Sequence, residues 1–473
     1  MHAEADISQD NNRDRLTRGG FMRAAVLSAG AVGALGASGV SLGAPRARAA
    51  RPGPGSRYPL FLPAERSPVG LVLTEAPGTA DLGGGKLSNV WAYNGSFPGP
   101  TLRARSGDRA TITLVNGLPQ ETITHWHGML VDDVNDGHPR FAVGPGGTYS
   151  YDFPVNQRAC LNWYHPHPHM LTGEQVNLGL AGAFIVNDTQ EAALGLPAGA
   201  YEVPLIVRDA TLDRGGNLEY RPRNGGFEGK IPLVNGTVDP YLEVDTALYR
   251  FRLLNGANAR IFGLALGNGA SFTLIGNDGG LLAAPVPLTR IDVAPAERLD
   301  LLVDFRGMPV GTRVMLRDLR AGWDLLEFRV ARQVNVPAAI PATLSVIPTL
   351  SNPVTTRTFS FDGMSRINGK VYDLSRIDFE VPFGQTERWR FTTKGNAPHP
   401  VHVHGASFQV QSRTGGRGTT YPWEQGWKDT VLLEDGETVD ILIRFNAYGG
   451  IYLIHCHKLE HEDMGMMANF KVV

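Results

Sequence analysis

Three stretches of the chain begin with an Asn-Gly pair and continue with the same alternation of apolar and polar residues. They start at Asn94, Asn235 and Asn368, and each leads into a strand-like run that contains arginine. An Asn-Gly pair is a strong signal for a tight hairpin turn, and alternation with a period of two is typical of half-buried β-strands. The starts lie 141 and 133 residues apart. Because that period is too long for one unit of a solenoid, it indicates three similar domains in tandem.

The composition supports the same interpretation. The chain has 473 residues, which is too many for one ordinary core. Its 57 glycines and 32 prolines are spread along the whole chain, which suits many short strands joined by tight turns. We therefore expect an all-β protein of three small antiparallel β-sandwiches, over residues 50–190, 200–335 and 354–473. A join near residues 188–204 and a Pro-rich stretch near residues 334–353 separate them.

The first 49 residues have the three parts of an export signal. Basic residues precede an apolar stretch over residues 24–44, and Ala47-Arg48-Ala49 offers a small-x-small cleavage site. Residues 17–23 resemble a twin-arginine motif in which Gly19 replaces the second arginine. We expect a periplasmic or extracellular protein. A membrane anchor is the alternative, which the scarcity of Leu and Ile in the stretch and the cleavage site behind it disfavour.

The charge of the chain argues against a polyanionic partner. Lys and Arg number 44 against 46 Asp and Glu, which leaves a formal net charge of -2, and no basic tract occurs. We expect no nucleic-acid partner. We also expect no membrane attachment after signal cleavage, since no other segment is long and apolar enough to span a bilayer. The protein is expected to be a monomer.

Most of the 13 histidines fall into four tight groups, each with a His-x-His pair. The pairs are His125 and His127, His165 and His167, His402 and His404, and His455 and His457. On an extended strand, residues two apart project from the same face, so the four pairs could present eight imidazoles to one space. A single pair would more often be two partly exposed histidines in a strand, whereas four pairs favour a site for several metal ions. Because two pairs lie in each terminal domain, the site would form where those domains meet.

The segment HCHKLEHEDMGMM, from His455 to Met467, divides in the same way. Cys456 faces the opposite side of the strand from its two neighbours, so it can bind a different ion. A copper held by His399, Cys456 and His461, with Met466 as a weak axial ligand, matches the blue-copper set better than a tetrahedral zinc site. A disulfide between Cys160 and Cys456 is the alternative, which the flanking histidines disfavour. Cys160 would then be a lone packing thiol.

At this point the motifs HWHG, WYHPH, HPVHVHG and HCHKLEHEDMGMM resemble those of the multicopper oxidases, in particular the bacterial three-domain laccase and cuprous-oxidase group. The resemblance implies three cupredoxin-like Greek-key domains and four copper ions per chain: one type 1, one type 2 and two type 3. It implies that the type 1 ligands are His399, Cys456, His461 and Met466, and that the type 2 ligands are His125 and His402. The type 3 ligands would be His127, His165, His167, His404, His455 and His457.

The resemblance also implies a mechanism. A reducing substrate gives up electrons singly at the type 1 copper, they pass through Cys456 to its flanking histidines, and the three-copper cluster reduces dioxygen to water. Asp136 and Glu462 match positions of proton-delivering carboxylates near the cluster, although each could instead be an ordinary surface or turn carboxylate. We expect His169 to have an outer or packing role and His138 to be a loop histidine.

The expected activity is laccase-like oxidation of phenols and aromatic amines, with oxidation of cuprous or ferrous ion for copper tolerance as the alternative. Some cuprous oxidases of the group carry a Met-rich insertion in domain three, whereas here the stretch from Phe361 to His457 has Met364 alone. Rival classes are a copper-sequestering protein without turnover, a copper-free cupredoxin protein and a two-domain nitrite reductase. The Cys456 bridge disfavours the copper-sequestering protein, and the full set of candidate ligands disfavours the copper-free protein. The third repeat disfavours the nitrite reductase.

Overall fold

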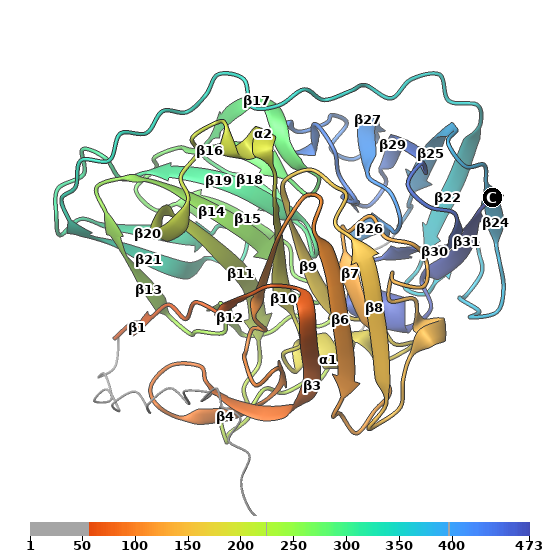
Figure 1. Ribbon diagram of the computed structural model, residues 1–473, viewed down its shortest axis with the longest axis horizontal. Helices are drawn as coiled ribbons and strands as arrows, with labels where there is room; N and C mark the ends of the chain where they lie inside the picture. The colour runs from red at the N-terminus through yellow and green to blue at the C-terminus, as the bar shows by residue number, and fades with distance from the viewer. Residues whose placement is uncertain (1–55, 224, 396–397) are drawn as a thin grey trace, which may run out of the picture. The chain divides into compact units, whose positions relative to one another are not determined.

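The computed structural model describes residues 56–223, 225–395 and 398–473, and its regular structure is almost entirely β (Figure 1). Six sheets form three pairs, one pair for each expected domain. The expected export signal, residues 1–49, lies outside the described residues. Among the described residues no helix is both long and apolar enough to cross a bilayer.

Two sheets make up the first domain. One sheet has, in order across the sheet, β4 (Leu87–Tyr93), β3 (Val69–Asp81), β6 (Arg109–Asn116) and β8 (Thr148–Pro154). The other has β2 (Glu65–Arg66), β5 (Thr101–Arg105), β10 (Gly182–Asn187), β9 (Cys160–Pro166) and β7 (Thr124–His127).

The second domain has β12 (Ile231–Val234), β11 (Glu202–Ala210), β14 (Leu248–Asn255), β19 (Arg298–Asp304), β16 (Phe272–Asn277) and β17 (Gly280–Leu288) in one sheet. Its other sheet has β1 (Tyr58–Pro59), β13 (Pro240–Asp245), β21 (Trp323–Arg332), β20 (Arg313–Asp318), β15 (Phe262–Leu266) and β18 (Ile291–Val293). The short strand β1 therefore pairs with the second domain although it precedes the first along the chain.

The third domain has β23 (Arg366–Ile367), β22 (Thr356–Asp362), β25 (Thr386–Thr392), β29 (Thr438–Arg444) and β27 (Phe408–Thr414) in one sheet. Its other sheet has β24 (Phe379–Val381), β31 (Met467–Val472), β30 (Gly450–Cys456), β26 (His399–Val403) and β28 (Thr430–Leu433). The short helices are α1 (Thr172–Asn177), α2 (Thr189–Ala192), α3 (Leu459–Asp463) and the 3-10 turns η1 (Pro139–Phe141), η2 (Gly199–Tyr201) and η3 (Pro422–Glu424).

Each domain has its own apolar core between its two sheets, as the alternation along the strands predicts. The first core contains Trp126 and Phe184, and the second contains Phe251 and Phe328. The third core contains Cys456, so the candidate copper ligand extends from the strand face that packs inside its own domain.

The expectation of antiparallel sandwiches is only partly correct, because every sheet also contains a parallel pair. Examples are β3 with β6, β11 with β14, and β22 with β25. Alternation of apolar and polar residues is the same in parallel and antiparallel strands, so the sequence pattern did not distinguish them. The parallel pairs arise where the chain crosses to the other sheet before it returns.

The three Asn-Gly pairs form the same turn. Asn94, Asn235 and Asn368 have φ values of 50°, 48° and 53°, and the glycine after each also has a positive φ. Each asparagine side chain accepts a hydrogen bond, at 2.7 Å, from the backbone N–H of a residue in the strand preceding its own hairpin: Thr74, Ile206 and Ser360. The repeat in the sequence is therefore a repeat of one turn and one side-chain anchor.

The Pro-rich connection between the second and third domains has no strand or helix between β21 and β22, as Figure 1 shows. Hydrogen bonds that involve side chains of the first and third domains hold this connection in place. Arg158 donates to the Ser345 hydroxyl at 2.7 Å, and the backbone N–H of Leu350 donates to the Gln409 side chain at 2.9 Å.

We predict that Asn235→Ala destabilises the second domain by about 2–5 kcal/mol, because alanine resists the left-handed backbone and leaves the N–H of Ile206 and the C=O of Pro204 without their buried partner. Asn368→Ala makes the same change at an exposed turn and should cost about 1 kcal/mol. Urea unfolding followed by circular dichroism measures both. Equal losses would contradict a role for the buried hydrogen bonds.

Candidate metal centre

Three ligand-type side chains meet inside the third domain. His399 begins β26, Cys456 ends β30 and His461 lies in α3. The Cys456 Sγ lies 3.4 Å from Nδ1 of His399 and 3.6 Å from Nδ1 of His461, and these two nitrogens lie 3.2 Å apart. The centre of such a triangle lies about 2 Å from each corner, which is the usual length of a metal–nitrogen bond in proteins. The three atoms therefore have the spacing of ligands around one ion.

The protonation of this group suits a metal. Burial, and next the charge of Lys458, lower the pKa of His399 to about 3, while burial and the neighbouring His399 lower the pKa of His461 to about 2. Both imidazoles are thus neutral at ordinary pH and have a lone pair to give. Burial raises the pKa of the Cys456 thiol to about 12. A metal ion would displace that proton when it binds.

Met466 lies beside this group. Its side chain is fully buried in the same core as Cys456, and its backbone carbonyl accepts a hydrogen bond from the Cys456 N–H at 3.1 Å. Its own N–H donates to the carbonyl of His461 at 2.9 Å. The backbone thus brings Met466 next to two of the three ligand-type residues.

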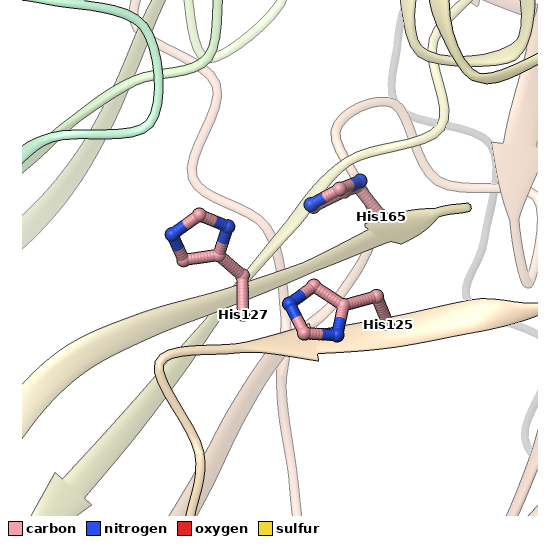
Figure 2. A group of neighbouring side chains, drawn as sticks. All are labelled: His125, His127 and His165. Carbon is pink, nitrogen blue, oxygen red and sulfur yellow. The ribbon is translucent and has the colours of Figure 1, made fainter. Parts of the chain in front are cut away.

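The eight histidines of the His-x-His pairs lie together where the first and third domains meet. They come from strands β7, β9, β26 and β30 or, for His167, His404 and His457, from the residues just after a strand end. In the strand register His125 is opposite His165, and His402 is opposite His455. Figure 2 shows the rings of His125 and His127, on β7, next to that of His165 on the neighbouring strand.

Their nitrogens are close enough to share metal ions. Within each of several sets the ligand atoms lie within 4.8 Å of one another; three such sets are His125 with His127 and His165, His125 with His402 and His404, and His167 with His404 and His455. Buried nitrogens without a hydrogen-bond partner include Nε2 of His125, His165, His402 and His457 and Nδ1 of His127. Buried polar atoms are normally paired, so this group of unpaired ones fits bound metal.

Seven of the eight imidazoles have a lowered pKa, which favours their neutral form. Burial comes first and neighbouring imidazoles second in lowering the pKa of His165 to about 3. Burial lowers the pKa of His167 to about 4, although Glu462 opposes it. For His125, His127, His402, His404 and His457, burial and adjacent histidines hold the pKa well below its ordinary value. Neutral imidazole is the form that binds metals.

Two buried carboxyl groups contact the outer side of the cluster. Nδ1 of His404 donates to Asp136 Oδ2 at 2.7 Å, and Nδ1 of His125 lies 2.5 Å from the Asp136 carbonyl. Glu462 lies 3.2 Å from Nδ1 of His455 and 3.5 Å from Nδ1 of His167. Burial raises the pKa of Asp136 well above its usual range. Burial would also raise the pKa of Glu462, but His167 and His455 outweigh it and lower that pKa.

Sequence reasoning missed a further carboxylate. Asp429 Oδ1 accepts a hydrogen bond from Nε2 of His127 at 3.1 Å, and its backbone carbonyl accepts one from Nδ1 of His402 at 2.8 Å. These contacts use the nitrogens that face away from the cluster, so they orient the rings. The one signal in the sequence was the charged pair Lys428-Asp429 directly before an apolar strand.

The remaining candidates lie apart from the two groups. His169 packs its ring on Tyr372 at 5.2 Å between centroids. His138 is buried, accepts a hydrogen bond from the Arg140 N–H and contacts the Asn469 side chain. Cys160 and Cys456 are both free, so they do not form the alternative disulfide.

We predict that Gly137→Ala disturbs the cluster, since the added Cβ would overlap the Thr124 carbonyl oxygen and lie 2.6 Å from Cα of His125. The loop that holds Asp136 must move, at a cost of about 3 kcal/mol. Unfolding midpoint and copper bound per chain measure the effect. Gly269→Ala is the control, because Gly269 also has a positive φ but no atom within 4 Å of the added Cβ. Equal copper binding in the two variants would contradict the prediction.

Comparison with known proteins agrees with this geometry. Two family models described as multicopper oxidase match residues 76–191 and 340–473. A protein named laccase from Bacillus subtilis is 32% identical over an alignment of 458 positions, gaps included, which covers 80% of this chain and 89% of the laccase.

Solved structures agree in fold. The McoA multicopper oxidase of the hyperthermophile Aquifex aeolicus superposes with a TM-score of 0.83 at 36% identity, over 88% of this chain and 99% of that one. A multicopper oxidase of Campylobacter jejuni, described as a metallo-oxidase, gives a TM-score of 0.76 at 26% identity, over 90% and 99% of the two chains. These matches confirm the all-β fold of three cupredoxin-like domains. The chain therefore belongs to the multicopper oxidase family, and it is a copper-dependent oxidoreductase whose electron acceptor is dioxygen.

Proposed function

We propose that the protein is a laccase-like oxidase, which couples one-electron oxidation of phenols or aromatic amines to the reduction of dioxygen to water. One observation carries the proposal. Cys456 belongs to a three-ligand group inside the third domain, while its neighbours His455 and His457 belong to the eight-histidine group. A tripeptide that serves two metal groups is what transfer of electrons between them requires.

We propose the assignment of copper ligands that the resemblance of the motifs to the family implies, and the two groups of ligand-type side chains support it. The mononuclear type 1 ion is assigned to His399, Cys456 and His461, with Met466 as the axial ligand. The type 2 ion is assigned to His125 and His402. The two type 3 ions are assigned to His127, His165, His167, His404, His455 and His457.

Bound copper supplies the redox chemistry, which is single-electron oxidation of the donor and the reduction of each dioxygen by four electrons and four protons to two waters. The chain supplies the rest. Covalent bonds alone link the Cys456 side chain to the two flanking histidines, so the path between the metal groups is short and fixed. Because the histidines are buried, bulk water is kept away from them.

Asp136 and Glu462 are the proposed proton-delivering groups: Asp136, whose pKa is raised by burial, as the group that holds a proton, and Glu462, whose pKa is lowered by His167 and His455, as a carboxylate that accepts a proton and passes it on. Both are buried and contact histidines of the cluster, and Oδ1 of Asp136 has no hydrogen-bond partner. A carboxyl group at hydrogen-bonding distance from a reaction site can deliver a proton directly or through one water.

The surface near the type 1 group supports an organic donor. His399 and His461 are fully buried, so a donor must give its electron without touching the ion. Val371, whose side chain packs on Gly465, is 43% exposed, and Met464 is 40% exposed. This apolar surface suits aromatic molecules. The exposed Met464 thioether is also a soft ligand, and for that reason cuprous ion is the second candidate donor.

We also propose that residues 1–49 direct export and that the mature protein is a monomer outside the cytoplasm. The small net charge of -2 and the free, buried cysteines are compatible with this location.

Oxygen uptake tests the proposed function. Copper-loaded protein should consume dioxygen with a phenol and an aromatic amine, and more slowly with cuprous or ferrous ion. Cys456→Ser should lose the intense blue colour of the thiolate–copper bond and uptake with every donor. Uptake with metal ions alone would favour the second candidate, and a Cys456→Ser variant that stays blue would exclude the type 1 assignment.

We predict that Asp136→Asn lowers the turnover rate about 100-fold while the blue colour persists, because the amide keeps the shape of the carboxyl group but cannot release a proton. Stopped-flow reduction and reoxidation measure the two halves of the reaction separately. Asp318→Asn, at a fully buried carboxylate of the second domain, is the control. If the variant were instead slow in the reduction of the protein by the donor, Asp136 would not act in the reaction with dioxygen.

A further inference from the structure

We propose that Arg298, in the second domain, is a positioning residue for the histidine cluster, and that it acts through Asp429. This inference rests on the proposed function, since it concerns the same cluster. It gives the middle domain, which supplies none of the proposed copper ligands, a defined part in holding them.

Arg298 is placed to hold one geometry. It begins β19, is fully buried, and donates to both carboxylate oxygens of Asp429, with Nη1 2.7 Å from Oδ1. Its other N–H groups donate to the carbonyls of Leu161 at 3.0 Å, Ala296 at 2.9 Å and Asp278 at 3.2 Å. The guanidinium thus joins residues of all three domains. A planar fork with two parallel hydrogen bonds fixes the orientation of the carboxylate as well as its position.

Asp429, held in this way, orients two histidine rings through hydrogen bonds. The rings of His127 and His402 are stacked with centroids 3.7 Å apart, and Asp429 bonds one through its side chain and the other through its carbonyl. Because Nε2 of His127 is held by the carboxylate, Nδ1 is the nitrogen left for a metal, and this atom has no other partner. The contact therefore selects which nitrogen of His127 faces the cluster.

A second contact from the middle domain supports the same loop. Asp278 accepts from Nζ of Lys428 at 2.9 Å and from the backbone N–H of Thr430 at 3.3 Å, so both neighbours of Asp429 are held. The hydroxyl of Thr430 lies 3.3 Å from Nε2 of His127. Middle-domain side chains thus brace residues 428–430 at three consecutive positions.

The space between Arg298, Asp429 and the HWHG motif is tightly filled. A Cβ on Gly128, in the HWHG motif, would lie 2.7 Å from Nη2 of Arg298 and 2.9 Å from Oδ2 of Asp429. Two residues before Arg298, Ala296 adopts φ of 68°, a conformation that alanine rarely takes. Strained backbone persists where the surrounding structure demands it, and here it leads directly into the arginine.

The test compares Arg298→Met with Arg252→Met in copper-loaded protein. Arg252 is an equally buried arginine of the second domain that pairs with Glu191, Glu202 and Asp300, none of which contacts a histidine of the cluster. Measurements are the electron paramagnetic resonance spectrum of the type 2 copper, the blue absorption of the type 1 copper, and copper retained against a chelator.

Arg298→Met should alter the type 2 spectrum and weaken retention of cluster copper about 10–100-fold, while the blue absorption is unchanged. Arg252→Met should leave the spectrum and retention as in the wild type, even if its unfolding midpoint falls. Arg298→Lys keeps the charge but not the fork, so it should fold and shift the same spectrum to a smaller extent.

A combined variant separates positioning from general stability. In an Asp429→Asn background, Arg298→Met should change copper retention by less than about twofold, because the residue that it acts through is already altered. Full additivity of the two substitutions would overturn the proposal, as would an unchanged type 2 spectrum in both Arg298 variants or an equal change in Arg252→Met. Wild-type protein that binds no copper would instead refute the proposed function.

Discussion

The burial of eight imidazoles in one space is the constraint on which the rest of the structure depends. Every ring has two nitrogens, and a buried nitrogen without a partner is costly. For most of the rings the protein provides a partner for the outer nitrogen, from carbonyls or from carboxyl groups such as those of Asp136 and Asp429. The inner nitrogens are left to metal. Strands from the first and third domains must therefore end at the same point, which fixes how those two domains pack.

The parts of this site that follow from local periodicity could be predicted from the sequence. Alternation along a strand places His455 and His457 on one side and Cys456 on the other, and the structure shows the two resulting groups. The Asn-Gly turns could also be predicted, because the positive φ that such a turn requires depends only on its two residues.

Contacts between distant segments were not predictable in this way. Arg298 and Asp429 are 131 residues apart and meet only because three domains pack together. In the sequence each stands next to a residue of opposite charge, Glu297 or Lys428, where a strand begins, which is what a solvated strand edge also looks like. Parallel pairing escaped prediction for a related reason, because the pairing direction depends on how the chain crosses between sheets and not on the pattern within a strand.

The separation of the ligands along the chain has a consequence for synthesis. His167 and His455 are 288 residues apart, yet their Nε2 atoms lie 3.5 Å from each other. The other candidate site also needs Cys456, the last residue of β30, and His461 in the helix that follows. A growing polypeptide therefore cannot assemble either candidate copper site until all three domains have left the ribosome. Loading with copper is thereby confined to chains whose translation has passed the third domain, and an incomplete chain holds only unpaired fragments of each site.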